Sequence, residues 1–344
     1  MEINKQELQA ALTKVKPGLA TKDVIEQTTS FAFMRGRVVT YNDEISISHP
    51  VPGLVDVEGA VKASALYAFL EKVKKDTITL EWEENQVVVK AGRAKAGLIF
   101  EREIRLPIEE EIINNTMEWT PLPNPEEFID ALRMCVPCAS SDMSRAILTC
   151  VYVNKDGVET TDSYRIMRYN LGTAVSDTPF LLPATAAREL IKYPVKDIAQ
   201  SDNWAHFRTE DGTIFSSRII MGDYPQINRL LAVDGEPFMF PITVPDILER
   251  AAIFAAGTEA FPTVVVKVAD GVAEFSTKGK HGWFRETVKV QNKVAVFSFT
   301  IGIDFLGAIL TTILDCVVGK DKIRFTGANW THIVAVWDQG SVSE

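Results

Sequence analysis

The residues of this chain that could do covalent or metal chemistry are few and scattered. Its 344 residues include four cysteines, and two of these, Cys135 and Cys138, form a Cys-x-x-Cys motif. Such a motif can be redox-active or supply half of a zinc site. Here it falls at the C-terminal end of a predicted helix, 125–136, whereas a helix stabilises a thiolate at its N-terminus. We predict two buried cysteines without a chemical role, and a redox protein that uses Cys135 and Cys138 is the alternative.

The other candidates for catalysis are single residues without a partner motif. The four histidines, His49, His206, His281 and His332, lie far apart in the sequence, and no His-Glu-x-x-His pattern joins any two of them. The chain also lacks the glycine-rich signatures of nucleotide-binding loops and the Gly-x-Ser-x-Gly signature of hydrolases. The acidic run 109–111 is typical of a solvated loop. We therefore predict no catalytic residue, no metal and no cofactor, and a protein that is not an enzyme.

Composition limits the function further. The chain carries 36 Lys and Arg against 46 Asp and Glu, a formal net charge of −10. This excludes a uniformly basic nucleic-acid binder but leaves room for a local basic surface. The first residues do not form a signal peptide, no apolar run is long enough to span a membrane, and four cysteines do not make a disulfide scaffold. We expect a soluble cytoplasmic protein.

An internal repeat organises the elements that would position any site. Residues 5–15 place Leu8, Ala11, Leu12 and Val15 on one stripe of an amphipathic helix. The same stripe returns after about 120 residues, in 125–136 behind the N-cap Asn124, and again after a similar interval in 244–254, where it ends on Phe254. Three copies with one period predict three related domains.

A second helix and two groups of strands recur with the same period. The second helices are predicted at 62–73, 183–193 and 302–313, each between runs that alternate and are rich in β-branched residues. Each unit therefore indicates an α+β domain with two helices packed on antiparallel strands. Proline-containing joints separate the units near 116–124 and 232–240. We predict domains at 1–117, 118–235 and 236–344.

These repeats, together with three local segments, resemble the bacterial β sliding clamps, the processivity factors of replicative DNA polymerases. The segments that carry the resemblance are VVVKAGRAKAGL (87–98), ETTDSYRIMRY (159–169) and FSSRIIMGDYPQINRLL (215–231). The third domain matches more weakly, through LERAAIF (248–254). The resemblance implies the DNA clamp fold, in which two three-domain chains join head to tail into a ring around duplex DNA.

The resemblance also implies partners and sites. The partners are double-stranded DNA held without sequence specificity, a replicative polymerase, an ATP-driven clamp loader and a second copy of the chain, with no membrane. The peptide pocket for the polymerase maps to Leu148, Thr161, Ser163, Tyr164, Arg165, Ile166, Pro225, Arg229, Leu230, Ile333, Ala335, Val336 and Trp337. The DNA channel maps to Lys14, Lys22, Lys72, Lys74, Arg145, Arg188, Lys192 and Lys196, and the dimer interface to Arg93, Ala96, Leu98, Ile253 and Phe254.

The chain departs from the family pattern at two places that bear on partner choice. Ser163-Tyr164 stands where the family commonly has Gly-His, and the C-terminus reads AVWDQGSVSE instead of the usual ending. Such drift suits a phage or mobile-element clamp. We expect the two arginines at the rim of the pocket, so that Arg165→Ala weakens peptide binding and leaves the melting temperature nearly unchanged. A clamp-fold phage structural or regulatory protein without processivity function is the remaining alternative.

Overall fold

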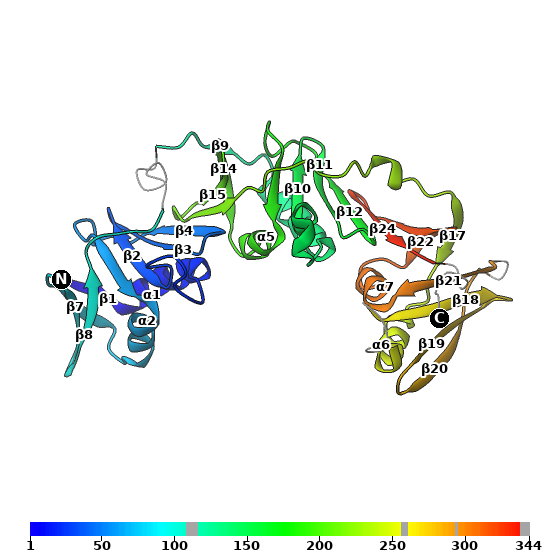
Figure 1. Cartoon of the computed structure of the whole chain (residues 1–344), viewed down its shortest axis with the longest axis horizontal. Coiled ribbons are helices and arrows are strands. Elements are labelled where there is room, and N and C mark those ends of the chain that lie inside the picture. The colour runs from blue at the N-terminus through cyan, green and yellow to red at the C-terminus, as the bar shows by residue number, and fades with distance from the viewer. Residues whose placement is uncertain (108–115, 256–260, 293–294, 338–344) are drawn as a thin grey trace. The chain divides into compact units, whose positions relative to one another are not determined.

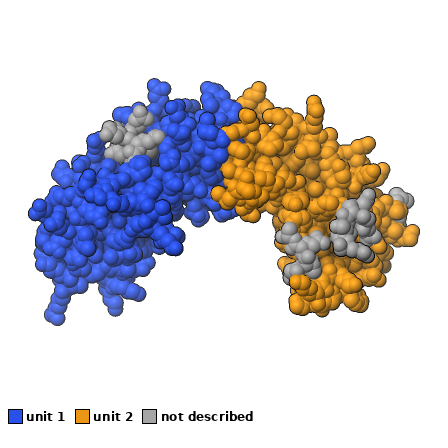
Figure 2. Space-filling model, viewed as in Figure 1, with its two compact units in different colours: residues 1–132, 173–221 blue, residues 133–172, 222–344 orange. Residues whose placement is uncertain are grey.

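The computed structural model describes residues 1–107, 116–255, 261–292 and 295–337 (Figure 1). The acidic run 109–111 and the last residues, 338–344, lie outside the described residues. The chain divides into two compact units, which Figure 2 colours separately. Unit 1 comprises Met1–Leu132 and Thr173–Met221, and unit 2 comprises Arg133–Gly172 and Gly222–Glu344. No helix in the described ranges is both long and apolar enough to cross a membrane.

Unit 1 is built on one antiparallel sheet. Within the described residues it has twelve strands, in the order β1 (Glu2–Asn4), β6 (Thr77–Trp82), β7 (Gln86–Ala91), β8 (Ala94–Glu101), β5 (Gly59–Lys62), β2 (Ser30–Met34), β3 (Arg37–Tyr41), β4 (Ile45–Pro50), β16 (Ile214–Arg218), β15 (Trp204–Thr209), β14 (Val195–Gln200) and β9 (Thr120–Pro121). Its helices are α1 (Lys5–Val15), α2 (Ala63–Lys72) and α5 (Ala184–Leu190), and the short strand β13 (Phe180–Pro183) bridges Ile220 through Leu181.

The first helix shows how the sequence builds these elements. The side chain of Asn4 caps α1 by accepting from the backbone N–H of Gln6 at 2.8 Å and of Glu7 at 3.2 Å. The predicted stripe from Leu8 to Val15 is buried along its length. A 3₁₀ turn that contains Pro17 then ends the helix. The helix predicted from periodicity is therefore confirmed with its boundaries.

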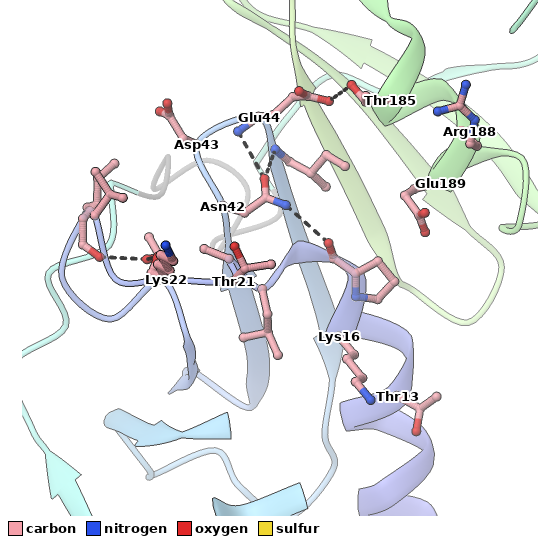
Figure 3. A pocket seen from close by; sticks show the side chains of 17 residues that line it. Thr13, Lys16, Thr21, Lys22, Asn42, Asp43, Glu44, Thr185, Arg188 and Glu189 are labelled. Atoms are coloured by element: carbon pink, nitrogen blue, oxygen red, sulfur yellow. Dashed lines mark hydrogen bonds between the residues drawn. The ribbon is translucent and has the colours of Figure 1, made fainter. Parts of the chain in front are cut away.

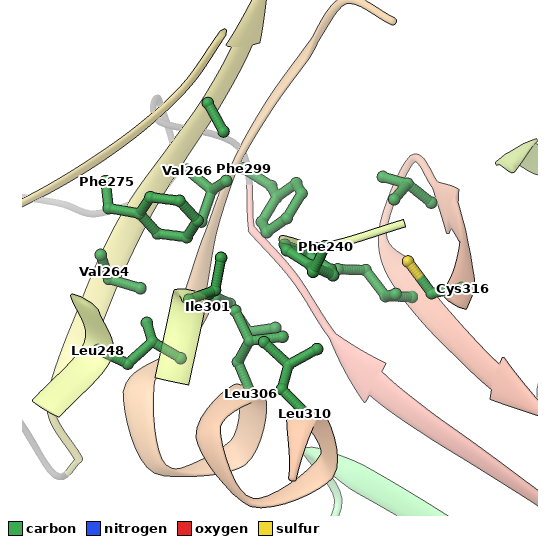
Figure 4. Close-up of a cluster of buried hydrophobic side chains, with 14 of the residues drawn as sticks. Phe240, Leu248, Val264, Val266, Phe275, Phe299, Ile301, Leu306, Leu310 and Cys316 are labelled. Atoms are coloured by element: carbon green, nitrogen blue, oxygen red, sulfur yellow. The ribbon is translucent and has the colours of Figure 1, made fainter. Parts of the chain in front are cut away.

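Unit 2 carries two antiparallel sheets. One contains, in this order, β10 (Cys150–Asn154), β11 (Gly157–Thr161), β12 (Arg165–Asn170), β24 (Trp330–Ala335), β23 (Lys322–Thr326), β22 (Asp315–Gly319) and β17 (Gly235–Met239). The other contains β20 (Gly282–Lys289), β19 (Val272–Gly279), β18 (Thr263–Ala269) and β21 (Phe297–Gly302). The helices α6 (Val244–Ala255) and α7 (Ile303–Leu310) pack with these strands around a core that includes Phe240, Leu248, Phe275 and Leu306 (Figure 4).

The predicted repeat reappears as helix pairs, with two differences at the helix ends. The first helices of the second and third repeats are α4 (Pro125–Cys135) and α6. The second helices are shorter than predicted, since α5 ends at Leu190 and α7 at Leu310. Pro194 disfavours helical conformation in the residue before it, and the β-branched run 311–313 follows α7. In α6 the buried stripe closes on Ala255, so that Phe254 is only half-buried.

The sheets run through the predicted domain joints. β4 of the first repeat pairs with β16 of the second, and β12 of the second pairs with β24 of the third. Because these ladders tie neighbouring repeats together, the two compact units do not coincide with the three repeats. The α+β class with antiparallel sheets is confirmed, whereas the division at 117 and 235 remains a prediction.

Candidate functional site

The Cys-x-x-Cys motif is buried, and its surroundings on balance disfavour a thiolate. Cys135 is the last residue of α4, and both cysteines are at most 3% exposed. Burial raises the pKa of the Cys138 thiol to about 12 and that of Cys135 well above its ordinary value. The sulfur of Cys138 lies 3.8 Å from Nδ1 of His332. Thiols with raised pKa values are poor nucleophiles, so the predicted structural role fits and the redox alternative finds no support.

Two of the four histidines, His206 and His332, are buried, whereas His281 is exposed. His206 is fully buried and its Nδ1 lies 2.8 Å from the hydroxyl of Ser216. Burial lowers the pKa of His206 to about 4 and that of His332 to about 3. Among the described residues, no group of three or more His, Cys, Asp or Glu side chains could hold a metal ion.

A partly exposed aromatic cluster in unit 2 is the strongest candidate for a binding surface. It consists of Tyr164, Phe261, Phe305 and Trp337, and we call it the aromatic surface. The ring of Tyr164 lies 4.9 Å from that of Phe261 and 6.2 Å from those of Phe305 and Trp337. Tyr164 is nevertheless 40% exposed. Clustered aromatic side chains that remain partly accessible are typical of protein-binding hot spots.

The turn between β11 and β12 holds Tyr164 on this surface. The carboxylate of Asp162 accepts from the backbone N–H of Tyr164 at 2.9 Å and of Arg165 at 2.7 Å. Ser163 takes the left-handed conformation, with φ of 79°. The backbone N–H of Ala335 donates to the carbonyl of Tyr164 at 2.8 Å, which fixes the turn to the C-terminal strand. The position of Tyr164 is therefore set by backbone geometry.

Arg165 is part of this framework and is not at the rim. Its guanidinium donates to the carboxylate of Asp162 at 2.8 and 3.0 Å and to the carbonyl of Pro137 at 2.9 Å. It also lies 4.3 Å above the ring of Phe305, and its side chain is only 13% exposed. The position differs from the expected rim arginine because the carboxylate two residues before Tyr164 draws the guanidinium inward.

The predicted peptide-pocket residues separate into exposed and buried members. Ser163, Tyr164, Pro225, Arg229 and Leu230 are exposed, and Leu148, Arg165, Ala335 and Trp337 are half-buried. Thr161, Ile166, Ile333 and Val336 are buried. Ile166 and Ile333 pack with Ile227 and Val233, so this pair fills the core beneath the surface.

The structure brings together the chain segments that the sequence placed at this site. The hydroxyl of Tyr224 accepts from the backbone N–H of Thr161 at 2.8 Å, and its ring stacks on that of Tyr152 at 5.1 Å. Burial raises the pKa of Tyr224, which keeps the hydroxyl protonated. The segment before Pro225 is thus bound to the end of β11.

Two members of the aromatic surface were missed from the sequence. Phe305 lies in α7 but outside its buried stripe of Ile303, Leu306, Ile309 and Leu310, and this off-stripe position was a signal that could have found it. Phe261 precedes β18, and no sequence pattern distinguishes it from a core residue.

The predicted DNA-contacting cations fall into two groups. Lys14 pairs with Asp211, Lys192 with Glu189 at 2.7 Å and Arg145 with Asp142 at 3.0 Å. The other five have no acidic partner within 4 Å among the described residues; they are Lys22, Lys72, Lys74, Arg188 and Lys196. These five side chains are exposed. Their positive charge is therefore not neutralised by an ion pair within the described ranges.

The residues predicted for self-association lie beside open strand edges. Arg93, Ala96 and Leu98 are on or next to β8, whose residues 94–99 pair with β7 alone in the described part of the chain. Ile253 is 66% exposed on α6, and Phe254 stacks on Phe284 of β20 at 6.1 Å. β20 ends the order of its sheet, so β8 and β20 each offer unpaired backbone groups.

Comparison with known proteins places the fold. No protein-family model and no curated protein matches the chain. Among solved structures it is similar to the DNA polymerase III beta chain from Streptococcus pneumoniae, with a TM-score of 0.86 and 20% identity over 98% of this chain and 99% of that one. The DNA polymerase sliding clamp from Bacillus subtilis matches with a TM-score of 0.82 and 17% identity over 98% of both chains. The DNA polymerase III beta subunit from Thermotoga maritima gives 0.80 and 13%, over 98% and 99%.

Proposed function

We propose that this chain, which has the fold of the bacterial sliding clamps, is itself a clamp that encircles duplex DNA and tethers a replicative polymerase. The observation that carries the proposal is the similarity of fold over 98% of the chain, with a TM-score of 0.86. A fold does not by itself imply a function. Three features of the chain's own residues support the assignment, and the placement of the thiols and histidines offers no catalytic alternative.

The first feature is the pair of open strand edges. In the proposal, the three predicted domains of one chain meet those of a second chain, and β8 of each pairs with β20 of the other. Ile253, which is 66% exposed, would be covered by this contact. Two heterologous contacts related by a two-fold axis close a ring and leave neither edge free.

The second feature is the set of five unpaired cations. We propose that Lys22, Lys72, Lys74, Arg188 and Lys196 contact DNA phosphates without reading bases, while the net charge of −10 repels nucleic acid elsewhere. Lys14, Arg145 and Lys192 already have carboxylate partners, so they would contribute less to the attraction. The expected result is a weak, salt-sensitive interaction that lets the ring slide.

The third feature is the aromatic surface. We propose that it takes short linear peptides from the polymerase and other partners, with Tyr164 as the exposed anchor and the half-buried Trp337, Phe261 and Phe305 around it. Aromatic side chains contribute a large contact area at low entropic cost. The exposed Leu230 and Arg229 would extend the contact along the segment after Pro225.

The test is retention on circular DNA. After incubation with an ATP-driven clamp loader, the protein should remain on nicked circular plasmid through gel filtration in high salt, and it should be lost when the plasmid is cut. Stimulation of long-chain synthesis by the cognate polymerase tests the second half of the proposal. Retention that survives linearisation contradicts topological binding. Retention without any effect on synthesis would favour the alternative of a clamp-fold protein without processivity function.

A further inference from the structure

Unit 1 contains a cleft of about 980 Å³ whose lining includes Lys22 and Arg188, two of the cations assigned above to DNA (Figure 3). The segment after α1 lines it with Lys16, Leu19 and Lys22, the turn between β3 and β4 contributes residues 42–45, and α5 contributes Thr185, Arg188 and Glu189. Asn42 lies in the middle of this arrangement, where its side-chain amide donates to the carbonyl of Pro17 at 3.3 Å. The cleft is as large as typical ligand sites.

The turn in this cleft is the first-repeat copy of the turn that holds Tyr164. The side-chain oxygen of Asn42 accepts from the backbone N–H of Glu44 at 3.2 Å and of Ile45 at 2.8 Å. The equivalent oxygen of Asp162 accepts from the residues two and three positions later. The left-handed residue recurs as well, because Asp43 has φ of 77° and Ser163 has φ of 79°. The repeat therefore reproduces the backbone of the aromatic surface about 120 residues earlier.

The surroundings of the turn are also repeated. The strand that follows each turn pairs with the next repeat, β4 with β16 and β12 with β24. The residue two positions after Asn42 or Asp162 contacts the second helix of the next repeat. Glu44 accepts a hydrogen bond from Thr185 of α5, and Tyr164 stacks with Phe305 of α7. The two sites share a framework but differ in chemistry, since polar side chains replace the aromatic ones.

The charges in the cleft are not balanced. Of its three carboxylates, Asp43 pairs with Arg218 at 3.5 Å and Glu189 with Lys192 at 2.7 Å, whereas Glu44 accepts from the neutral hydroxyl of Thr185. Lys16 is held above the ring of Tyr67, 4.5 Å from its centroid. Lys22 and Arg188 have no acidic partner within 4 Å among the described residues, and both are exposed. Lys16, Lys22 and Arg188 therefore outnumber Glu44, the one carboxylate of the lining without a cationic partner among the described residues, and the cleft carries a net positive charge.

Apart from Asn42 and the threonines Thr13, Thr21, Thr28 and Thr185, the remaining lining is apolar. Leu19, Ala20 and Ile25 are half-buried and Val24 is 92% exposed, and all four line the cleft. A phosphodiester chain would leave this apolar area without a complementary group, whereas an aliphatic side chain would cover it. The combination of an apolar lining with two cations therefore favours a peptide over a nucleic acid.

We propose that this cleft is a second docking site of the chain, which binds a short acidic peptide segment bearing aliphatic side chains. Lys22 and Arg188 bind the carboxylates of the peptide, and Leu19, Ala20 and Ile25 contact its aliphatic side chains. This proposal rests on the proposed function in one respect, that the copy of the turn at Tyr164 supports a docking site. The cleft does not depend on ring formation. Because Lys22 and Arg188 are also proposed to contact DNA phosphates, the peptide and DNA would compete for these two side chains.

The experiment measures binding of a labelled probe to the full chain. The probe is a fluorescein-labelled peptide of sequence Glu-Leu-Glu-Leu-Glu, followed by fluorescence anisotropy, with Lys-Leu-Lys-Leu-Lys and Glu-Gly-Glu-Gly-Glu as control peptides. Lys22→Glu and Arg188→Glu should each raise the Kd for the acidic aliphatic peptide about fivefold or more. Lys155→Glu is the matched control, because Lys155 is an exposed lysine outside both sites. It should change the Kd less than twofold, and both control peptides should bind more weakly.

Four results would overturn the proposal. An absence of binding to the unmodified chain at millimolar peptide is the first, and an equal effect of all three charge reversals, which would indicate unspecific attraction, is the second. The third is a loss of binding in Tyr164→Ala but not in Lys22→Glu, which would assign the peptide to the aromatic surface. In the fourth, both cleft variants lose affinity for a duplex oligonucleotide but not for the peptide, which would make the cleft a nucleic-acid site. A chain that fails the plasmid test can still pass this one.

Discussion

Replacing Arg165 should destabilise unit 2, because this side chain supports the turn beside the aromatic surface. The guanidinium forms a forked pair with Asp162, donates to the carbonyl of Pro137 and lies on the ring of Phe305. Both partners of the ion pair are nearly buried, with 13% and 11% of their side chains exposed. Arg165→Ala would leave the Asp162 carboxylate in that environment without its cation.

The magnitude follows from three contributions. Removing one partner of a buried ion pair costs about 3–5 kcal/mol when the other charge stays unpaired. Asp162 keeps its two backbone N–H donors, which lowers this figure to about 1–2 kcal/mol. The lost cation–π contact and the lost hydrogen bond to Pro137 add about 1 kcal/mol each. We expect Arg165→Ala to destabilise unit 2 by about 3–4 kcal/mol, and Arg165→Lys, which retains the charge but not the fork, by about half of that.

Urea unfolding followed by tryptophan fluorescence measures this loss. Arg229→Ala is the matched control, because Arg229 is exposed and should cost less than about 0.5 kcal/mol. A double-mutant cycle with Asp162→Asn, which preserves the side-chain acceptor for the turn, should give a coupling energy of about 2 kcal/mol. If Arg165→Ala were no more destabilising than Arg229→Ala and the coupling were near zero, the framework role would be refuted.

Three further predictions concern the aromatic surface, acid stability and self-association. Tyr164→Ala should weaken binding of a polymerase-derived peptide by about 1–3 kcal/mol in calorimetric titration while the urea midpoint changes little, because Tyr164 is 40% exposed; an unchanged affinity would remove it from the partner surface. Burial lowers the pKa of His206 to about 4, against about 6.5 in the unfolded chain. His206 therefore does not affect stability above pH 6.5, and the free energy of unfolding decreases as the pH falls from 6.5 towards 4, because the unfolded chain binds the proton first. Urea titrations across this window should show that His206→Asn reduces the slope by up to about 1.4 kcal/mol per pH unit, and an unaltered slope would mean that the histidine titrates normally. Ile253→Asp should shift the protein from dimer to monomer in sedimentation at micromolar concentration, and a dimer of undiminished affinity would place the interface elsewhere.

Much of the fold could be predicted from the sequence because burial is encoded locally. The stripe that begins at Leu8 and the stripe of α4 follow from the 3.6-residue period, and the caps Asn4 and Asn124 follow from residue type. The recurrence of that pattern at an interval of about 120 residues needed no structure either. The position of Cys138 just beyond a helix C-terminus already indicated a thiol with no reactive role, and burial explains why its pKa is raised.

Only the tertiary structure decided which residues near the repeated turns are accessible. Arg165, Ile166 and Tyr164 are consecutive, yet the first is ion-paired, the second is in the core and the third is exposed. Strand alternation distinguishes neighbouring faces, but the hydrophobic partners come from segments more than 60 residues away. Tyr164 meets Phe261 and Phe305, and Ile166 packs with Ile227 and Ile333. The cleft beside Asn42 depends in the same way on how α5 lies against the first repeat. Contacts of this kind are set by strand register and helix packing between distant segments, and no local pattern in the sequence encodes them.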